Sequence, residues 1–336
     1  MARNRDKVRW GVISTADIGV AKVIPGMMKS KDIEIRAIAS RALPTAKKAA
    51  KKLGIPVAYG SYEELLDDPE IEAIYNPLPN HLHVPLTLAA ARKGKHVLCE
   101  KPIAITAAEA AELRDIPQGI LVAEAFMVRA HPQWIAAREL VRKGKLGEMR
   151  AVQSLFTYHN VDPHNVRNMA DIGGGALYDI GCYPIVIGRY IFGAEPVRVV
   201  ALVDRDPTFR TDRTASALVD FGAGRHLTFT VSTQAARYQR VNILGTRRRL
   251  EVRIPYNAPQ GGAVAIYLDD GKELGDASAR PTKFPKVDQY QLQGEIFSRA
   301  VRGKAPLPFG VEDAILQMRV IDALFRSEKS GAWETP

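Results

Sequence analysis

The sequence predicts an α/β protein: an N-terminal, doubly wound parallel sheet followed by a C-terminal α/β domain with a large, mainly antiparallel open sheet. The chain has 336 residues, which is more than a single hydrophobic core usually organises. Its first 125 residues alternate short apolar runs with helical stretches, as parallel strands joined by right-handed crossovers do. Longer strand-like runs separated by Gly-containing turns follow, which is typical of an antiparallel sheet. We therefore expect two domains, 1–125 and 126–336.

The elements of the first domain are expected in a regular order. Buried parallel strands are predicted by short apolar runs at 8–14, 33–39, 73–76, 96–99 and 120–124. Helical stretches lie between them, at 20–28, 45–53, 62–66, 83–93 and 107–114.

The second domain opens with one more helix, 132–143, and the turn Gly144–Gly147 that follows it changes the pattern. Strands are predicted at 149–158, 197–203, 214–221, 226–232, 241–244, 250–254 and 264–268. Helices are predicted at 176–191, 288–301 and 311–327.

Composition excludes several classes of protein. No stretch approaches the ~18–20 apolar residues of a membrane helix, and the charged start leaves no room for a secretory signal. We therefore expect a cytoplasmic protein without a membrane partner. Cys99 and Cys182 form no Cys-x-x-Cys pair, and His81 with His83 lacks a third ligand, so we expect no metal site.

The net charge of +10 raises the question of nucleic acid. The lysines at 47, 48, 51 and 52 lie on the polar side of a helical stretch, and the arginines at 247–249 lie in a turn. Neither cluster has interleaved aromatic residues, so we expect no nucleic-acid partner. A positive field would instead help to collect an anionic, phosphorylated cofactor.

The turn after the first strand resembles a dinucleotide-binding turn of the Rossmann kind. The G-x-G-x-x-G pattern would align on Ser14, Ala16 and Gly19, and only the last position keeps its glycine. Serine and alanine are small enough to let the backbone approach a pyrophosphate at a helix N-terminus. The prediction is therefore that the turn binds the cofactor, and an ordinary strand-to-helix turn remains the alternative. The residues concerned are Ser14, Thr15, Ala16, Asp17 and Ile18.

The end of the second strand indicates which dinucleotide binds. NAD enzymes place Asp or Glu about twenty residues after the glycine turn, whereas this strand ends in Ser40-Arg41. A guanidinium can pair with a 2′-phosphate and stack on adenine. This predicts NADP, unless Arg41 is merely a solvated loop residue.

Motifs spread over the whole chain resemble one family. They are Pro79-Asn80-His81-Leu82-His83, Gly94-Lys95-His96-Val97, Glu100-Lys101-Pro102, the turns 144–147 and 173–175, and Asp179-Ile180-Gly181-Cys182-Tyr183. In this order and at this spacing they resemble the glucose–fructose oxidoreductase / inositol dehydrogenase (Gfo/Idh/MocA) family, whose fold is the one expected above.

The resemblance implies roles for particular residues. Lys101 occupies the family's catalytic lysine position, and Tyr183 stands where many members have a histidine acid/base, four residues after Asp179. In having a tyrosine at this position, the sequence resembles the glucose–fructose oxidoreductase, aldose–aldose oxidoreductase, NADP xylose dehydrogenase and dihydrodiol dehydrogenase branches. The resemblance also implies a cis Lys101–Pro102 bond, although X–Pro bonds are cis in only ~5% of cases.

Further cofactor contacts follow from the same resemblance, at Pro79, Asn80, His83 and Glu100. His83 would lie near the nicotinamide, or be a helix-start histidine with a structural hydrogen bond. Glu100 would hold the cofactor ribose, or satisfy backbone donors.

The chemistry is reasonable for these residue types. Asp179 and Tyr183 are spaced i, i+4, so on a helix they share one face. A nearby Lys101 ammonium would favour the phenolate of Tyr183, which could then take a proton from a sugar hydroxyl. Asp179 could orient Lys101 or bind a neighbouring hydroxyl. In the polar loop before this helix, Asp162, Asn165 and Arg167 could bind substrate hydroxyls or cap a turn.

The predicted function is an NADP-dependent oxidoreductase that acts at C1 of an aldose, giving a lactone, with reduction of a second sugar carbonyl as a further possibility. A trans-1,2-dihydrodiol dehydrogenase is one alternative. A non-catalytic NADP-sensing regulator is another, although such a protein need not keep both Lys101 and Tyr183. The open sheet is expected to pair with a second copy, giving a homodimer or a dimer of dimers.

Overall fold

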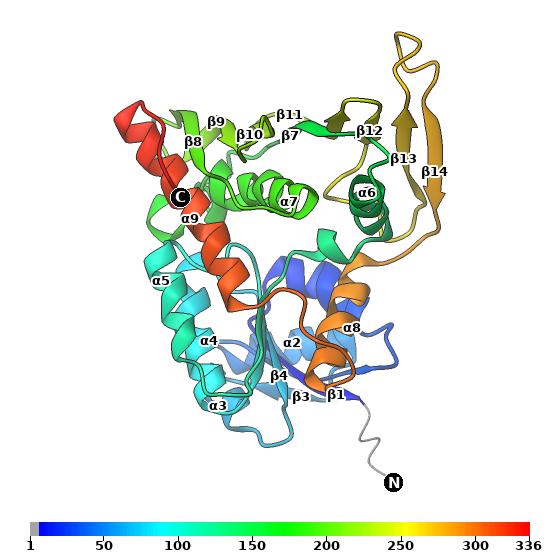
Figure 1. The fold of residues 1–336 in the computed structure, drawn as a ribbon. Helices are drawn as coiled ribbons and strands as arrows, with labels where there is room; N and C mark the ends of the chain where they lie inside the picture. The colour runs from blue at the N-terminus through cyan, green and yellow to red at the C-terminus, as the bar shows by residue number, and fades with distance from the viewer. Residues whose placement is uncertain (1–6) are drawn as a thin grey trace. The chain divides into compact units, whose positions relative to one another are not determined.

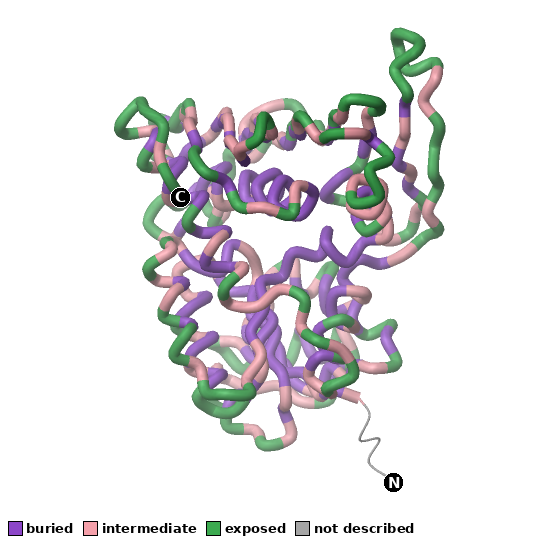
Figure 2. The backbone as a smooth tube through the Cα atoms, in the orientation of Figure 1, coloured by how far each residue is buried: buried purple, intermediate pink, exposed green. Residues whose placement is uncertain are grey.

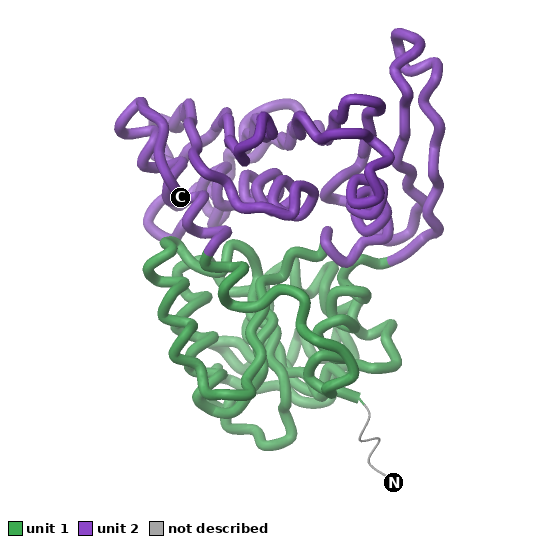
Figure 3. Tube along the Cα trace, in the orientation of Figure 1, with its two compact units in different colours: residues 1–127, 288–315 green, residues 128–287, 316–336 purple. Residues whose placement is uncertain are grey.

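The structure, a computed structural model, describes residues 7–336 and divides into two compact units (Figure 3). Residues 1–6, which belong to the expected first domain and to the charged start, lie outside the described residues. The first unit runs to Met127 and also contains Asp288–Ile315, while the second comprises Val128–Val287 and Leu316–Pro336. Asp288–Ile315 therefore groups with the first unit, whereas the expected domains place all residues after 125 in the second.

Long-range packing explains this difference. Helix α8 (Gln289–Val301) places Phe297 against Trp10 of strand β1 (Val8–Ile13), with ring centroids 5.4 Å apart. The indole Nε1 of Trp10 donates to Ser298 Oγ at 3.2 Å. A Cβ on Gly294 would lie 2.8 Å from Ile33 Cδ1, so the helix approaches strand β2 (Ile33–Ala39) closely at a glycine. These contacts join segments more than 250 residues apart in the sequence, and no local pattern reveals them.

The sheet of the first unit confirms the expected doubly wound arrangement (Figure 1). Its order is β3-β2-β1-β4-β5-β6, and all its neighbouring strands are parallel. Beside β1 the strands are β2 (Ile33–Ala39), β3 (Val57–Tyr59), β4 (Ala73–Asn76), β5 (His96–Cys99) and β6 (Val122–Glu124). Only the three-residue β3 was not expected. The order reverses between β1 and β4, which is where open sheets of this kind bind ligands.

The helices of the first unit lie where they were expected, with local changes: the expected helix 107–114 divides into α5 (Ala107–Ala111) and the 3-10 turn η3 (Glu112–Asp115), and the short 3-10 helix η2 (Asn80–Leu82) was not expected. The helix after β1 begins as a π-helical turn, η1 (Gly19–Val23), before α1 (Ile24–Met27). The other helices are α2 (Leu43–Leu53), α3 (Tyr62–Asp67), η2 (Asn80–Leu82), α4 (His83–Arg92), α5 (Ala107–Ala111), η3 (Glu112–Asp115) and α8.

The second unit contains an eight-stranded sheet of order β14-β13-β12-β11-β7-β10-β9-β8. Its strands are β7 (Met149–His159), β8 (Arg198–Arg205), β9 (Asp212–Asp220), β10 (His226–Ser232), β11 (Gln234–Gly245), β12 (Arg249–Val252), β13 (Val264–Asp269) and β14 (Arg280–Phe284). β10 runs parallel to β7 and the remaining pairs are antiparallel, which confirms a mainly antiparallel sheet.

One helix of the second unit, α7 (Cys182–Phe192), is buried along almost its whole length. Every residue from Cys182 to Ile191 is buried (Figure 2). It packs on β7 and β10 and is preceded by a π-helical turn, η7 (Leu177–Gly181). The other helices around this sheet are η4 (Met127–Ala130), α6 (Pro132–Arg142), η5 (Val166–Asn168), η6 (Ala170–Ile172) and α9 (Val311–Ser330). Among the described residues, no helix is long and apolar enough to cross a membrane.

Candidate functional site

The expected cofactor-binding residues of the first unit gather at the carboxyl ends of its strands. Ser14 follows β1, Ser40 follows β2, and Glu100 and Lys101 follow β5. Because all the strands are parallel, these ends lie along one edge of the sheet, where open α/β sheets bind ligands.

The turn after β1 shows how a serine serves at the first glycine position. Ser14 has φ 91°, a left-handed conformation that glycine adopts far more readily. Its Oγ accepts a hydrogen bond from Ala16 N at 3.1 Å, which stabilises the turn locally. Val20 N then donates to Ala16 O at 3.0 Å, so Thr15 precedes the first helical turn, while Asp17 and Ile18 lie within it. Ser14 therefore adopts, at the first glycine position, a backbone conformation that glycine favours.

The segment that follows β2 contains groups that favour the binding of an anion. Arg41 is exposed and lies one residue before the N-cap Ala42 of α2, whose N-terminus has no side-chain cap and no acidic residue in its first turn. The N–H groups of an uncapped helix N-terminus and a nearby guanidinium both favour a phosphate. No carboxylate stands at the end of β2 to oppose it.

A buried tyrosine that the sequence did not indicate holds Glu100. Tyr75 of β4 is fully buried, and its hydroxyl donates to Glu100 Oε1 at 2.6 Å. Burial, together with the Glu100 carboxylate, raises the pKa of Tyr75 well above its usual value, so the hydroxyl stays a donor. Nothing in the apolar run 73–76 singles out this residue, because the contact joins two different strands.

His83 is buried in the first unit and contacts the two loops that contain Leu78 and Pro102. It is 1% exposed, with Nε2 2.6 Å from Leu78 O and Nδ1 2.7 Å from Pro102 O. Burial lowers the pKa of His83 to about 4. Both ring nitrogens thus lie against backbone carbonyls, which favours the structural role for His83 over a direct cofactor contact.

The remaining residues expected to contact the cofactor follow β4 and β5. Pro79 is the N-cap residue of the short helix η2, and Asn80 is its first residue. The Lys101–Pro102 peptide bond is cis, as expected, and Lys101 is partly exposed.

In the second unit, Asp179 is the centre of a polar cluster. Tyr158 of β7 donates its hydroxyl proton to Asp179 Oδ2 at 2.6 Å, and Arg167 Nε lies 3.0 Å from Oδ1. Burial first and the Asp179 charge second raise the pKa of Tyr158. The pKa of Arg167 is also raised, chiefly by Asp179. Tyr158 was not predicted from the sequence.

Tyr183 lies beside this cluster, 6% exposed and packed among aromatic rings. Its ring centroid is 5.8 Å from that of Phe156 and 5.3 Å from that of Tyr256. The expected single α-helix through Asp179 and Tyr183 is interrupted, because Asp179 sits in the π-helical turn and Tyr183 in α7. Turns of this kind occur frequently at functional sites.

The polar loop before this helix separates into two kinds of residue. Asp162 Oδ1 accepts from His164 N at 2.9 Å, and Asn165 Oδ1 accepts from Arg167 N at 3.1 Å. Asp162 and Asn165 thus make the contacts of turn caps, whereas the Arg167 side chain reaches Asp179.

Asp212 is a further residue that the sequence did not indicate. It is 1% exposed at the start of β9, and its Oδ2 accepts from Leu177 N at 2.6 Å. Gly175 has φ 118°, and a Cβ there would collide with the Asp212 carboxylate. Asp212 therefore anchors the start of the segment that carries Asp179 and Tyr183.

Metal-binding groups are not present in the described part of the chain. Within residues 7–336, no three His, Cys, Asp or Glu side chains form a group that could hold a metal ion. Cys99 and Cys182 are both buried and form no disulfide.

Comparison with known proteins agrees with this geometry. Residues 8–118 match the model described as "Oxidoreductase family, NAD-binding Rossmann fold", and residues 134–251 match "GFO/IDH/MocA C-terminal domain". An uncharacterized oxidoreductase of Rhizobium meliloti is 48% identical over 332 residues, 98% of this chain and 99% of that protein. The D-xylose 1-dehydrogenase (NADP(+)) 2 of Haloferax volcanii is 37% identical over 96% of this chain and 98% of its own length.

Among solved structures, a 3-ketoreductase from Actinomadura kijaniata, in complex with NADP and TDP-benzene, superposes with a TM-score of 0.88. It is 29% identical, and the match covers 96% of this chain and 98% of the other. The fold and these matches define an NAD(P)-dependent oxidoreductase. The chain belongs to the Gfo/Idh/MocA family.

Proposed function

We propose that this oxidoreductase uses NADP and transfers a hydride between the nicotinamide and C1 of an aldose, giving the lactone in the oxidative direction. The observation that carries the proposal is the presence of both Lys101, which follows β5, and Tyr183, which lies on α7. Asp179 lies in the π-helical turn η7 that precedes α7. The similarity to a D-xylose 1-dehydrogenase supports an aldose as substrate. A regulator that only senses NADP would need neither side chain.

NADP is the cofactor that the first unit suits best. The turn of residues 14–18 would hold the pyrophosphate, and Arg41 with the uncapped start of α2 would hold the 2′-phosphate. Glu100, fixed by Tyr75, would accept from a ribose hydroxyl. Pro79, Asn80 and Lys101 would line the nicotinamide end. When bound, the oxidised nicotinamide supplies the acceptor for the hydride that leaves C1.

The chain's own side chains would manage the proton. In the oxidative direction, the Tyr183 phenolate takes the proton of the C1 hydroxyl. In the reverse direction, the Tyr183 hydroxyl returns that proton. The Lys101 ammonium would contact the reacting oxygen and stabilise negative charge on it. Asp179 holds Arg167 and Tyr158 in place beside this tyrosine.

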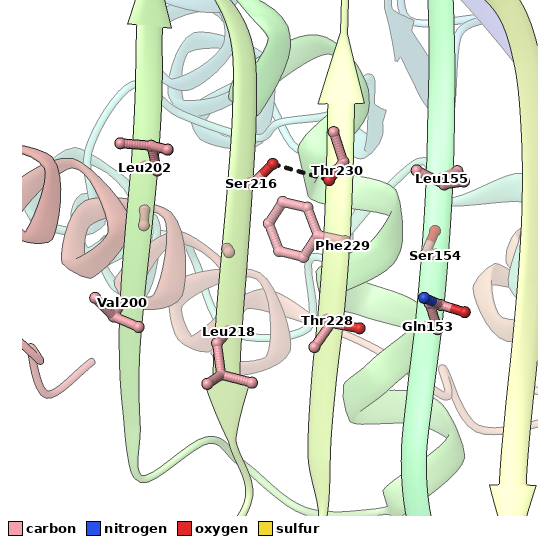
Figure 4. A pocket seen from close by; sticks show the side chains of 12 residues that line it. Gln153, Ser154, Leu155, Val200, Leu202, Ser216, Leu218, Thr228, Phe229 and Thr230 are labelled. Atoms are coloured by element: carbon pink, nitrogen blue, oxygen red, sulfur yellow. Dashed lines mark hydrogen bonds between the residues drawn. The ribbon is translucent and has the colours of Figure 1, made fainter.

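A second copy of the chain is the partner we propose for the outer face of the large sheet. Leu155, Leu202 and Leu218 point outward there from β7, β8 and β9, around a hollow of about 400 Å³ (Figure 4). Leu202 is 79% exposed. Covering such a face removes apolar surface from water, so we propose a homodimer or dimer of dimers. We also propose a cytoplasmic location, because Cys99 and Cys182 form no disulfide, as is usual in a reducing compartment.

A substrate screen tests the proposed function. Purified protein is mixed with NADP and single aldoses, and the nicotinamide absorbance is followed while NMR identifies the lactone. Parallel arms hold a trans-1,2-dihydrodiol, a 3-keto nucleotide sugar with NADPH, and an aldose with a second sugar as acceptor. We expect at least one pentose or hexose to react with kcat/KM about tenfold or more above the dihydrodiol. Tight NADP binding without turnover of any aldose would contradict the proposal.

A further inference from the structure

The segment that follows β5 in the first unit becomes buried directly after Lys101. Glu100 and Lys101 are partly exposed, whereas Pro102, Ile103 and Ala104 are buried, the last two completely. A backbone N–H or C=O group that is buried away from water needs a hydrogen-bond partner. This segment is neither helix nor strand, so its backbone groups depend on other parts of the chain for their partners.

One peptide group of this segment is confined at both of its polar ends. It joins Pro102 to Ile103, and its N–H donates to Glu124 Oε1 at 2.9 Å. Its carbonyl oxygen lies 2.7 Å from Nδ1 of His83. Glu124 is 5% exposed and His83 is 1% exposed, so both contacts are inside the unit. Because a peptide group is planar, contacts at its two ends fix its orientation.

The orientation of this peptide group bears directly on Lys101, because only Pro102 lies between them. The ring of a proline restricts φ to about −65°, so ψ is the one soft backbone torsion that Pro102 contributes. A side chain that holds the peptide group after Pro102 therefore also limits where the backbone of Lys101 can lie.

The strand that carries Glu124 is fixed to the strand from which this segment departs. Glu124 is the last residue of β6 and pairs in parallel register with Cys99, the last residue of β5. Directly after it, Ala125 N donates to Cys99 O at 2.7 Å. The carboxylate of Glu124 is thus anchored two residues before Lys101 and reaches the chain two residues after it, at Ile103.

We propose that Glu124 is a positioning residue that acts through Lys101: its carboxylate holds the peptide group that follows Pro102 and thereby fixes where the Lys101 side chain starts. A hydrogen bond from a backbone N–H to a carboxylate is stronger than one between neutral groups. Glutamine at this position keeps an acceptor oxygen for Ile103 N, whereas alanine removes it. The contact of Lys101 with the reacting oxygen rests on the proposed function, but the hold of Glu124 on the segment does not.

Two measurements on the full-length protein test this hold without any substrate. In Glu124→Ala, hydrogen exchange of the Ile103 amide, followed by NMR, should be about tenfold faster than in wild type. Acylation of Lys101 by acetic anhydride, measured by mass spectrometry of its peptide, should be more than about threefold faster, because the segment opens more often. Glu124→Gln should stay close to wild type in both measurements. If Glu124→Ala does not fold, Glu124→Met serves the same comparison, because it fills the space with an apolar side chain.

Glu109→Ala is the matched control. Glu109 Oε2 accepts from Ile105 N at 2.8 Å, so this variant also removes a carboxylate that holds a backbone N–H in the first unit, two residues further along. It should leave the exchange of the Ile103 amide and the acylation of Lys101 unchanged.

Kinetics with a reacting aldose test whether the effect passes through Lys101. Glu124→Ala should lower kcat about tenfold or more, and Glu124→Gln should keep more than about half of it. In a Lys101→Ala background, Glu124→Ala should lower kcat no further.

Four results would overturn the proposal: unchanged exchange at Ile103 in Glu124→Ala, unchanged acylation of Lys101 in that variant, equal effects of alanine and glutamine, or a further loss of kcat in the Lys101→Ala background. If exchange and acylation change as expected but no aldose reacts, the proposed function fails while the hold of Glu124 on Lys101 stands.

Discussion

Replacing Asp212 by asparagine should make the stability of the second unit less dependent on pH. Asp212 is 1% exposed, and burial raises its pKa from 3.8 to about 7, against the hydrogen bond from Leu177 N. The charged groups facing it are Arg205 and Glu328, which pair with each other at 2.6 Å. Asparagine keeps the shape and an acceptor oxygen for Leu177 N but cannot ionise.

The sign follows from proton binding. Between pH 3.8 and about 7 the folded protein retains the Asp212 proton that the unfolded chain has lost. The free energy of unfolding therefore falls as the pH rises through this window, and the loss is complete above it. A shift of about three units corresponds to about 4 kcal/mol in full, of which about 3 kcal/mol should be lost between pH 5 and pH 8.

Urea unfolding of wild type and Asp212→Asn at pH 5 and pH 8, followed by tryptophan fluorescence, measures this difference. Trp134 is buried in the second unit and reports its unfolding. Relative to wild type, the variant should gain about 3 kcal/mol on going from pH 5 to pH 8. Asp204→Asn removes an exposed carboxylate of the same unit and should show no such gain. A gain below about 1 kcal/mol would refute the reasoning, because Asp212 would then be ionised in the folded protein at pH 5.

Three further predictions follow from the site and the sheet. Wild type should bind NADP at least about tenfold more tightly than NAD, and Arg41→Ala should remove most of this preference. If a fluorescence titration of wild type gives equal affinities for NADP and NAD, the predicted preference is wrong. Tyr183→Phe should lower kcat by ~10²–10⁴-fold and leave the NADP Kd unchanged, and Lys101→Ala should lower kcat at least as much. In the double variant the two losses of kcat should be far from additive, because the residues act as one unit. If Tyr183→Phe keeps more than about a third of wild-type kcat, another residue carries the proton. Leu155→Lys with Leu202→Lys should convert the proposed dimer to monomer in light scattering, whereas a monomeric wild type at micromolar concentration would contradict the sheet pairing.

The fold could be predicted from sequence wherever apolar periodicity was strong. The buried strands β2, β4, β5 and β10 fall at the expected residues. β14 (Arg280–Phe284) was missed because it is a polar edge strand that contains a proline, and β11 was predicted only for its apolar end. Exposed strands are held by their hydrogen-bonded neighbours rather than by an alternating pattern, so the sequence carries little signal for them.

The candidate site divides in the same way. Motifs indicated Lys101, Asp179 and Tyr183, but the left-handed φ of Ser14 was not predicted. Tyr75 and Tyr158, which hold Glu100 and Asp179 by hydrogen bonds of 2.6 Å, were not indicated. Each lies in a strand where an aromatic residue is also an ordinary packing residue. Their roles depend on partners more than 20 residues away in sequence, which only the fold brings close.

Gly175 shows why such partners escape a reading of local sequence. The glycine run at 173–175 was recognisable, and the left-handed φ of Gly175 gives one reason for it. The second reason is the Asp212 carboxylate, which occupies the space of a Cβ while it accepts the N–H of Leu177. A motif therefore marks where the backbone is constrained, but not which residue constrains it. If Asp212 sets the start of the segment that carries Asp179 and Tyr183, then Asp212→Ala should lower kcat and leave the NADP Kd unchanged, because that cofactor would bind the first unit. A loss of NADP affinity equal to the loss of kcat would instead show that Asp212 supports the fold as a whole.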